Sequence, residues 1–400
     1  MAGPLQGIKV VELGLWVAGP SAAAILADWG ASVVKIEPPE GDPFRGLFAS
    51  ALGSPIEINP PFELDNRGKR SIALNLDTDK GKEIAQQLVA DADVLISNMR
   101  PRVLTQFGLD YDTVSRTNPG IVYCQVTGYG PDHEEANRAA YDVGAFWSRA
   151  GIASALTPAG HDLPQQRGGM GDHMTGANAA GAISAALYAR EKTSKGQRLS
   201  VSLLRVGCYM MGWDISLALR LGVPIEPYDR QHAVNPIINC FKGSDGQWFW
   251  LLRLQADRHW PDLLRAIHRE DLDSDSRFAD INLRRENAPA LIQELDKTFA
   301  TKTRAEWAEA FDADDVWWAP VNTINEVLSD PMAEQAGVFV DVPGPDGPIR
   351  MVATPAHFYG TPAGPQSAAP ELGQNTEELL LEMGYDWDAI IKLKEEQAII

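Results

Sequence analysis

One stretch of this 400-residue chain combines a flexible turn with a reactive side chain. The sequence GGMGDHMTG at residues 168–176 precedes Ala-rich sequence up to Arg190, which predicts a long helix that begins near Asp172. A carboxylate at a helix start can be a covalent nucleophile, or it can simply cap the helix. From the motif alone, capping is the favoured interpretation.

The surrounding sequence alternates between buried strands and helices. Strands are predicted at residues 8–13, 32–37, 71–76, 93–97, 120–126 and 198–204, and helices at residues 21–29, 80–90, 139–150 and 205–221. This alternation predicts an α/β fold with a parallel, doubly wound sheet. Ligands bind beside the carboxyl ends of the strands in such sheets, and the segment NMRP at 98–101 follows one of them.

Two loops in the N-terminal part of the chain indicate which ligand it could bind. Residues 14–20 lack the G-x-G-x-x-G spacing that brings a backbone close to a pyrophosphate, and this disfavours a nicotinamide cofactor. Residues 38–66 are rich in Pro and Gly and are predicted as a long irregular segment. Compact domains usually keep such segments for a function.

A second domain is expected from the chain length and from a change in character near Pro224. A hairpin is predicted at residues 237–241 and 248–252, with helices after it as far as 312. A further hairpin is predicted at residues 338–342 and 349–353. The order of these elements favours a smaller α+β domain.

A formal charge of -19 makes nucleic acid an improbable partner. An anionic ligand would need a local basic patch, and the candidates are Arg67 to Arg70 and the pair Arg100 and Arg102, although most charge runs are solvated surface. No apolar run is long enough to span a bilayer, and the N-terminal sequence lacks a signal-peptide pattern, so a cytoplasmic protein is expected. Neither the seven His nor the three Cys residues show metal-site spacing.

An ordered series of motifs resembles the class III CoA-transferases, the group of formyl-CoA transferase and carnitine CoA-transferase. The motifs are LQGIKVVE at 5–12, AGP at 18–20, LADWGA at 26–31, VKIEPP at 34–39, GDPFR at 41–45, NRGKRS at 66–71, NMRP at 98–101 and GD at 171–172. Each motif is weak by itself, but their order and spacing together are specific.

The resemblance implies a Rossmann-like large CoA-binding domain of residues 1–205, completed by about 371–400. It implies a connector at 206–224, a small domain at 225–330 and a returning connector at 331–370. It also implies an interlocked, ring-like homodimer. The implied substrates are an acyl-CoA and a free carboxylic acid, with no tightly bound cofactor and no metal.

By position, Asp172 resembles the family's catalytic aspartate, which passes through a mixed anhydride and an aspartyl-CoA thioester. A carboxylate suits this role, because an anhydride preserves the energy of the thioester, which an ester of Ser would dissipate. We expect the helix dipole to keep Asp172 ionised and backbone N–H groups to stabilise an oxyanion.

The resemblance also implies residues that contact CoA. They are Val17, Ala18, Leu74, Asn98, Arg100, Arg102, Tyr141 and Asp142. Arg100, Arg102 and the cluster from Arg67 to Arg70 are the available cations for the CoA phosphates. The chain departs from the formyl-CoA enzyme where that enzyme has basic residues, namely at Pro38, Asp77, Gln106 and Ala139.

Two other functions stay open at this point. Alpha-methylacyl-CoA racemases share the fold and move an α-proton between a His and an Asp. This chain has Tyr141 where their pattern has His, and a neutral Tyr is a poor base near pH 7, which favours transfer. His133 and His173 remain possible bases. The third function is CoA binding without catalysis.

Overall fold

The computed structural model describes residues 3–47, 58–158 and 160–400 of the chain. Its contacts divide the chain into two units. Unit 1 comprises Met1–Ser154, Pro164–Pro224 and Gly337–Ile400, and unit 2 comprises Ala155–Leu163 and Ile225–Ala336. The second unit is therefore an insertion between parts of the first.

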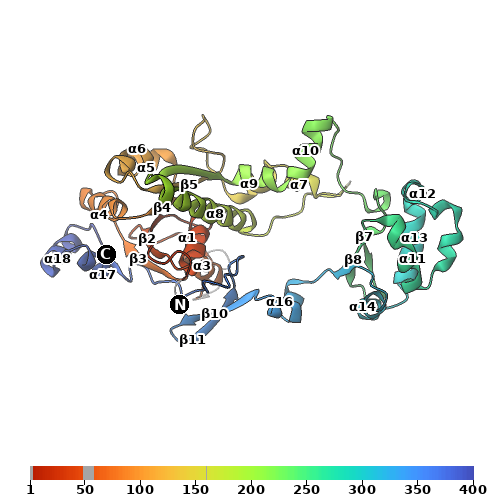
Figure 1. Cartoon of the computed structure of the whole chain (residues 1–400). Coiled ribbons are helices and arrows are strands. Elements are labelled where there is room, and N and C mark those ends of the chain that lie inside the picture. The colour runs from red at the N-terminus through yellow and green to blue at the C-terminus, as the bar shows by residue number, and fades with distance from the viewer. Residues whose placement is uncertain (1–2, 48–57, 159) are drawn as a thin grey trace. The chain divides into compact units, whose positions relative to one another are not determined.

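Unit 1 is built on a parallel sheet, which has six strands within the described residues (Figure 1). The strands are β1 (Lys9–Leu13), β2 (Ser32–Glu37), β3 (Lys69–Ala73), β4 (Val94–Ser97), β5 (Val122–Thr127) and β6 (Gln197–Ser202). Their spatial order is β3-β2-β1-β4-β5-β6. This is the order of a doubly wound Rossmann sheet, so the predicted α/β class with a parallel sheet is confirmed.

Helices cover both faces of this sheet. The first face packs against α1 (Ala18–Asp28) and α8 (Met170–Thr193), and the apolar core there includes Ala22, Ile96 and Ile183. The other face packs against α4 (Asp79–Ala90), α5 (Pro101–Phe107), α6 (Tyr111–Thr117), α17 (Thr376–Glu382) and α18 (Trp387–Glu395). Strands buried on both faces explain the near-continuous apolar runs in the sequence.

The C-terminal segment completes this unit at the edge of the sheet. Asn375 Oδ1 accepts a hydrogen bond from the backbone N–H of Ser71 in β3, at 3.1 Å. Leu74 and Ile399 form an antiparallel bridge just beyond that strand. A hairpin of β10 (Phe339–Gly344) and β11 (Gly347–Val352) precedes this segment in the same unit.

The structure differs from the sequence prediction in several short elements of unit 1. Within the predicted irregular segment, residues 48–57 lie outside the described residues, but α3 (Pro60–Asn66) is a helix that Asn59 caps by accepting from Phe62 N. The predicted helix at 139–150 is a short π-helix, η1 (Val143–Ser148). The single helix predicted at 205–221 is two helices, α9 (Leu203–Met210) and α10 (Gly212–Leu221).

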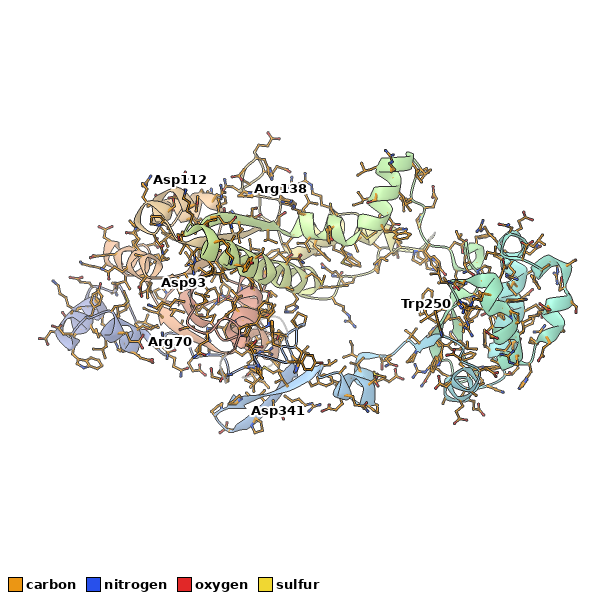
Figure 2. All side chains as sticks on the ribbon, viewed as in Figure 1. Arg70, Asp93, Asp112, Arg138, Trp250 and Asp341 are labelled. Carbon is orange, nitrogen blue, oxygen red and sulfur yellow. The ribbon has the colours of Figure 1, made fainter. Side chains whose placement is uncertain are left out.

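Unit 2 contains an antiparallel sheet of β7 (Ile238–Lys242), β8 (Trp248–Leu252) and β9 (Trp318–Pro320). Trp250, labelled in Figure 2, lies on the middle strand β8. The helices are α11 (Ala256–Ile267), α12 (Ile281–Glu286), α13 (Ala288–Phe299), α14 (Arg304–Ala313), α15 (Ile324–Val327) and α16 (Pro331–Gln335). Unit 2 has its own apolar core between the sheet and the helices, which includes Phe249, Leu263 and Phe299.

Candidate active site

A pocket of about 250 Å³ lies where the order of the parallel strands reverses, between β1 and β4. The loop after β1 contributes Trp16 and Ala18, and the loop after β4 contributes Asn98 and Arg100. The two loops meet because β1 and β4 are neighbours and their connections leave in opposite directions. Asp172 lines the same pocket from the first turn of α8.

The backbone before α8 explains how Asp172 reaches this pocket. Gly169 is the N-cap of α8 and has φ +73°, a left-handed conformation that favours glycine. A Cβ atom there would also lie 3.0 Å from Cε1 of His173. Asp172 is thus the third residue of the helix, and its interpretation as the cap is wrong.

The pKa of Asp172 is raised from 3.8 to about 7. Burial is the largest cause, the nearby charge of Asp142 adds to it, and the charge of His173 opposes it. Desolvation and a like charge thus outweigh the helix dipole, so Asp172 is only partly ionised near neutral pH, contrary to the expectation that the dipole keeps it fully ionised. Such a shift is typical of functional carboxylates in clefts.

Asp142 provides the missing cap of α8. Its side chain is 8% exposed, and its Oδ2 atom accepts a hydrogen bond from the backbone N–H of Gly171 at 3.1 Å. This contact satisfies one of the unpaired N–H groups of the first helical turn. Asp142 therefore fixes the helix end that presents Asp172 and raises the pKa of Asp172 at the same time.

Asn98 holds the loop after β1. Its Oδ1 atom accepts from the backbone N–H of Leu15 at 3.0 Å, and its Nδ2 atom donates to the carbonyl of Leu15 at 2.6 Å. Both ends of the amide are thus engaged within the protein, although Asn98 lines the pocket as predicted. The geometry favours a positioning role for this side chain.

Trp16 lies on that loop in a left-handed conformation with φ +66°. Such a backbone is uncommon for a bulky residue and persists where surrounding contacts fix it. Its N–H donates to Oδ1 of Asp42 at 3.1 Å, and its ring meets Tyr141 edge-on with centroids 5.9 Å apart. Trp16 and Tyr141 together form an aromatic wall of the pocket.

A buried charge cluster holds the loop after β1 in place. The ammonium of Lys35 lies 2.9 Å from Glu12 and 3.0 Å from Asp42, and it donates to the carbonyl of Gly14 at 2.8 Å. The side chains of the ion pairs are fully buried. Since a buried charge is tolerated only with partners, this cluster fixes the loop position stringently.

The remaining predicted CoA contacts are placed differently. Arg100 is an exposed residue at the start of α5 and lines the pocket, whereas Arg102 is exposed beside it. Val17 is buried against Phe44 and Phe62. Leu74 is fully buried beside Ile399 at the far edge of the sheet. The structure therefore brings Ala18, Asn98, Arg100 and Tyr141 into the lining of this pocket, and does not bring in Val17, Leu74, Arg102 and Asp142.

The basic cluster from Arg67 to Arg70 is engaged internally. Arg67 is 2% exposed and pairs with Asp28 at 2.7 Å, and buried Lys69 pairs with Glu12 at 2.6 Å. Arg70 pairs with Glu378 and Glu382. The prediction that this cluster could receive the CoA phosphates is wrong for its two buried members, because carboxylates distant in sequence already neutralise them.

Sequence reasoning missed Arg138 and Trp16 as pocket residues. Arg138, labelled in Figure 2, lies on the loop that follows β5 and forms an exposed ion pair with Glu135. It stands next to Ala139, one of the positions noted for a missing basic residue. A search one residue to either side of those positions would have found it.

Within the described residues, no group of three or more His, Cys, Asp and Glu side chains is placed to hold a metal ion. No helix in the same set is sufficiently long and apolar to cross a membrane.

Comparison with known proteins relates the whole chain to one family. The model of CoA-transferase family III matches residues 5–376. The chain is 33% identical over 400 residues to the cinnamoyl-CoA:phenyllactate CoA-transferase of Clostridium sporogenes, covering 99% of this chain and 97% of that protein. It is 30% identical over 399 residues to the (R)-2-hydroxy-4-methylpentanoate CoA-transferase of Clostridioides difficile, covering 99% of each.

A solved structure has the same fold. A CAIB/BAIF family protein from Brucella suis superposes with a TM-score of 0.83 and 30% sequence identity, over 96% of this chain and 100% of that one.

Proposed function

The chain belongs to CoA-transferase family III, and from this premise we propose that Asp172 is the residue that carries the acyl group and then CoA during transfer to a free carboxylic acid. The observation behind this proposal is the position of Asp172. It is an acidic side chain in the first turn of a long helix, in a pocket at the reversal point of a Rossmann sheet.

The proposed reaction has four displacements. A carboxylate oxygen of Asp172 attacks the thioester carbonyl of the acyl-CoA, and the C–S bond breaks to give a mixed anhydride and CoA thiolate. The thiolate attacks the Asp172 carbonyl, which forms an aspartyl-CoA thioester and releases the donor acid. The acceptor carboxylate then displaces the thiolate, and the thiolate attacks the acceptor carbonyl to release the new acyl-CoA and Asp172.

The local electrostatics suit this cycle. A carboxyl group with a pKa of about 7 is a stronger nucleophile once ionised than an ordinary carboxylate, and near neutral pH a large fraction of it is ionised. Candidate oxyanion donors are backbone amides in the first turns of α1 and α8, because the N–H groups of Leu15 and Trp16 already donate to Asn98 and Asp42. Because Asp142 already occupies the N–H of Gly171, that amide is not one of them.

We propose that Ala18, Asn98, Arg100, Tyr141 and Asp142 surround the thioester end of CoA. The pocket volume of about 250 Å³ is enough for that end and too small for the whole of CoA, so the nucleotide part would lie outside it. Arg100 and Arg138 line the pocket, and Arg102 is exposed next to α5's first residue. These three are our candidates for the cations that meet the phosphates.

Chemical trapping tests the role of Asp172. The protein is incubated with acyl-CoA and no acceptor, treated with borohydride, and digested for mass spectrometry. An aspartyl-CoA thioester at Asp172 would be reduced to homoserine, and hydroxylamine would convert the same intermediate to a hydroxamate. The matched control is Asp172→Asn, which removes the nucleophile while keeping the side-chain shape and should show no modification. Absence of modification at Asp172 across a panel of thioesters would contradict the proposal and favour CoA binding alone.

Racemisation is distinguished by solvent exchange. In deuterated water, a transferase of this mechanism moves CoA between carboxylates without replacing the α-hydrogen. Rapid α-deuteration of acyl-CoA without transfer would instead assign proton transfer. The acceptor panel should include phenyllactate and (R)-2-hydroxy-4-methylpentanoate, the acids in the names of the two relatives, alongside simple carboxylates.

We further propose that unit 1 is the large CoA-binding domain predicted for residues 1–205 and 371–400, and that the chain acts as the interlocked homodimer of its family. One feature supports the dimer. Helix α10 has no buried residue, and Trp213 and Leu219 on it are 81% and 82% exposed. Such apolar side chains mark an interface. Sedimentation of wild type and Trp213→Asp would test this, and a monomeric wild type would contradict it. The cytoplasmic location stays a prediction.

A further inference from the structure

Unit 2 contains a buried arginine, Arg253, with two guanidinium nitrogens that find no acceptor among the residues the structure describes. Arg253, directly after β8, is 1% exposed, and its Nε and Nη2 atoms are enclosed without a hydrogen-bond acceptor among the described residues. Its backbone is bonded, because its N–H donates to Ile237 O at 3.3 Å and its carbonyl accepts from Asn235 Nδ2 at 3.1 Å. The guanidinium is thus held in place while the donors on Nε and Nη2 are unused within the described residues.

This arrangement is costly for the unliganded protein. An Arg side chain cannot lose its proton to escape burial, because its pKa lies far above neutrality. An enclosed charge without a partner destabilises a fold much as a broken buried ion pair does. Proteins keep such groups where a ligand supplies the missing charge, and the planar guanidinium fork matches a carboxylate or a phosphate.

The other buried arginine of this unit provides a direct comparison. Arg284 is also 1% exposed, but its Nη1 atom donates to the carbonyl of Phe278 at 2.7 Å and its Nη2 atom pairs with Asp257. Arg284 therefore has partners within the chain for both of its terminal nitrogens, and only its Nε atom lacks one among the described residues. The absence of any such compensation among the described residues sets Arg253 apart.

A second unpaired group lies beside Arg253. His259 in α11 is 6% exposed, and its Nδ1 atom has no partner among the residues described. Burial lowers the pKa of His259, and the charges of Arg253 and Arg258 lower it further, so the imidazole is neutral near pH 7. A neutral imidazole with its proton on Nδ1 donates one hydrogen bond. Two side chains therefore offer donors here without a matching acceptor.

Nearby carboxylates do not fill this role. Asp262 and Asp315 attract Arg253 through space, but neither forms a hydrogen bond or ion pair with it. Asp262 is already paired with Arg265 at 2.9 Å, and Asp315 is exposed to solvent. Water screens an exposed carboxylate, so its attraction for a buried guanidinium is weak.

An exposed aromatic ring and an exposed apolar side chain lie near the two donors. The ring of Trp317 lies 5.1 Å from the ring of His259, and Trp317 is 54% exposed. Leu254, next to Arg253 in sequence, is 74% exposed. A ligand could therefore reach the donors after a side-chain rotation, with its apolar part against Trp317.

We propose that Arg253 and His259 form an oxyanion-binding site in unit 2, which takes a carboxylate or phosphate group of a substrate. The two donors and the exposed aromatic ring fit a ligand with one anionic group and an attached apolar or aromatic part. The site depends on the local geometry of unit 2 and not on the role proposed for Asp172, so a failure of either proposal leaves the other standing.

Thermal unfolding of the full chain tests this site in two ways, by the unfolding temperature without ligand and by the stabilisation that an oxyanion gives. Arg253→Met removes the uncompensated charge while keeping most of the side-chain volume, so the unliganded variant should unfold at a higher temperature than wild type. Inorganic phosphate, acetate and CoA should each be compared with chloride at equal ionic strength. An oxyanion that binds the site stabilises wild type, and Arg253→Met should weaken its binding by about tenfold or more.

Matched variants separate this effect from general charge loss. Arg284→Met should lower the unfolding temperature, because it leaves the buried Phe278 carbonyl without its donor. Arg258→Met removes a charge from the exposed side of α11 and should leave the oxyanion effect intact. Trp317→Ala should weaken CoA or an aryl carboxylate more than phosphate, since it removes the aromatic neighbour.

The probes also identify the source of the oxyanion. Stabilisation by phosphate and CoA but not by acetate would assign the site to a phosphate of CoA, and the reverse pattern would assign it to the carboxylic acid. The proposal is overturned if none of the probes stabilises wild type, if Arg253→Met keeps the full stabilisation, or if that variant unfolds at a lower temperature than wild type without ligand.

Discussion

The Nε2 atom of His173 lies 3.0 Å from Oδ1 of Asp65, so the residue that follows Asp172 is tied to α3. Asp65 is 2% exposed, and its Oδ2 atom has no hydrogen-bond partner in the described part of the chain. Burial would lower the pKa of His173, but the hydrogen bond and charge of Asp65 outweigh burial and raise it. Asp65 therefore favours the protonated imidazole of His173 beside Asp172.

His173→Gln should move the rate–pH profile of transfer to higher pH. The positive charge of His173 lowers the pKa of Asp172, so its removal leaves the effects of burial and Asp142 unopposed. We expect a shift of about one pH unit. His133→Gln is the control, because the His133 ring bonds to the Tyr129 carbonyl on an exposed loop. An unchanged profile in His173→Gln would show that the pair is only structural.

Asp142→Asn should shift the same profile in the opposite direction. The amide oxygen of Asn can still accept from the N–H of Gly171, so the helix end is kept while the like charge is removed. The pKa of Asp172 should then fall by about one unit, and transfer should persist at lower pH. A profile that moves upward, or a loss of helical stability equal to that of Asp142→Leu, would contradict this assignment.

The free energy of unfolding should decrease as the pH rises, because Asp172 titrates. The folded-state pKa of about 7 lies above the ordinary 3.8, so the stability contributed by the protonated group is fully present below pH 3.8 and is lost as the pH rises through 7. Asp172→Asn should therefore be more stable than wild type at pH 8, by about 1–3 kcal/mol after allowance for partial exposure. Urea unfolding at pH 5 and pH 8 measures this, and a difference that does not grow with pH would refute it.

Two glycines of α8 should respond oppositely to the same substitution. A Cβ on Gly176 would lie 2.1 Å from Oγ of Ser21 and 3.0 Å from the backbone N of Ala22, so Gly176→Ala forces α1 and α8 apart and should cost about 1–3 kcal/mol. Gly181 faces solvent with nothing within 4 Å, so Gly181→Ala should stabilise the helix by about 0.5–1 kcal/mol. Equal effects in urea unfolding would mean that the two helices do not pack this closely.

The spacing of apolar residues and the order of the predicted elements supported much of the fold prediction. Strands that are buried on both faces leave continuous apolar runs, which can be recognised in the sequence. The short helix α3 was missed for a physical reason. Its start, Asn59 followed by Pro60 and Pro61, has the composition of a loop, yet Asn59 caps the helix and Pro occupies the first turn, where no N–H is needed. The break between α9 and α10 leaves no comparable signal, since apolar residues continue across it.

The site was predictable in its residues but not in its electrostatics. Asp172, Asn98 and Arg100 could be located from motifs and from the rule that ligands bind at strand ends. The burial of Arg67 against Asp28, 39 residues away, could not, because partners distant in sequence decide whether a cation is free. The raised pKa of Asp172 likewise depends on burial and on Asp142, neither of which the local sequence reveals.

The C-terminal segment also protects the sheet from other chains. Asn375 and Thr376 accept hydrogen bonds from the N–H groups of Ser71 and Ala73, and the Leu74–Ile399 bridge continues this cover beyond β3. Without these contacts, β3 would be an open edge strand, and exposed edge strands recruit further strands into aggregates. The last residues of the chain thus act as a built-in guard against aggregation, and truncation before residue 371 should yield a protein that precipitates rather than one that is merely less active.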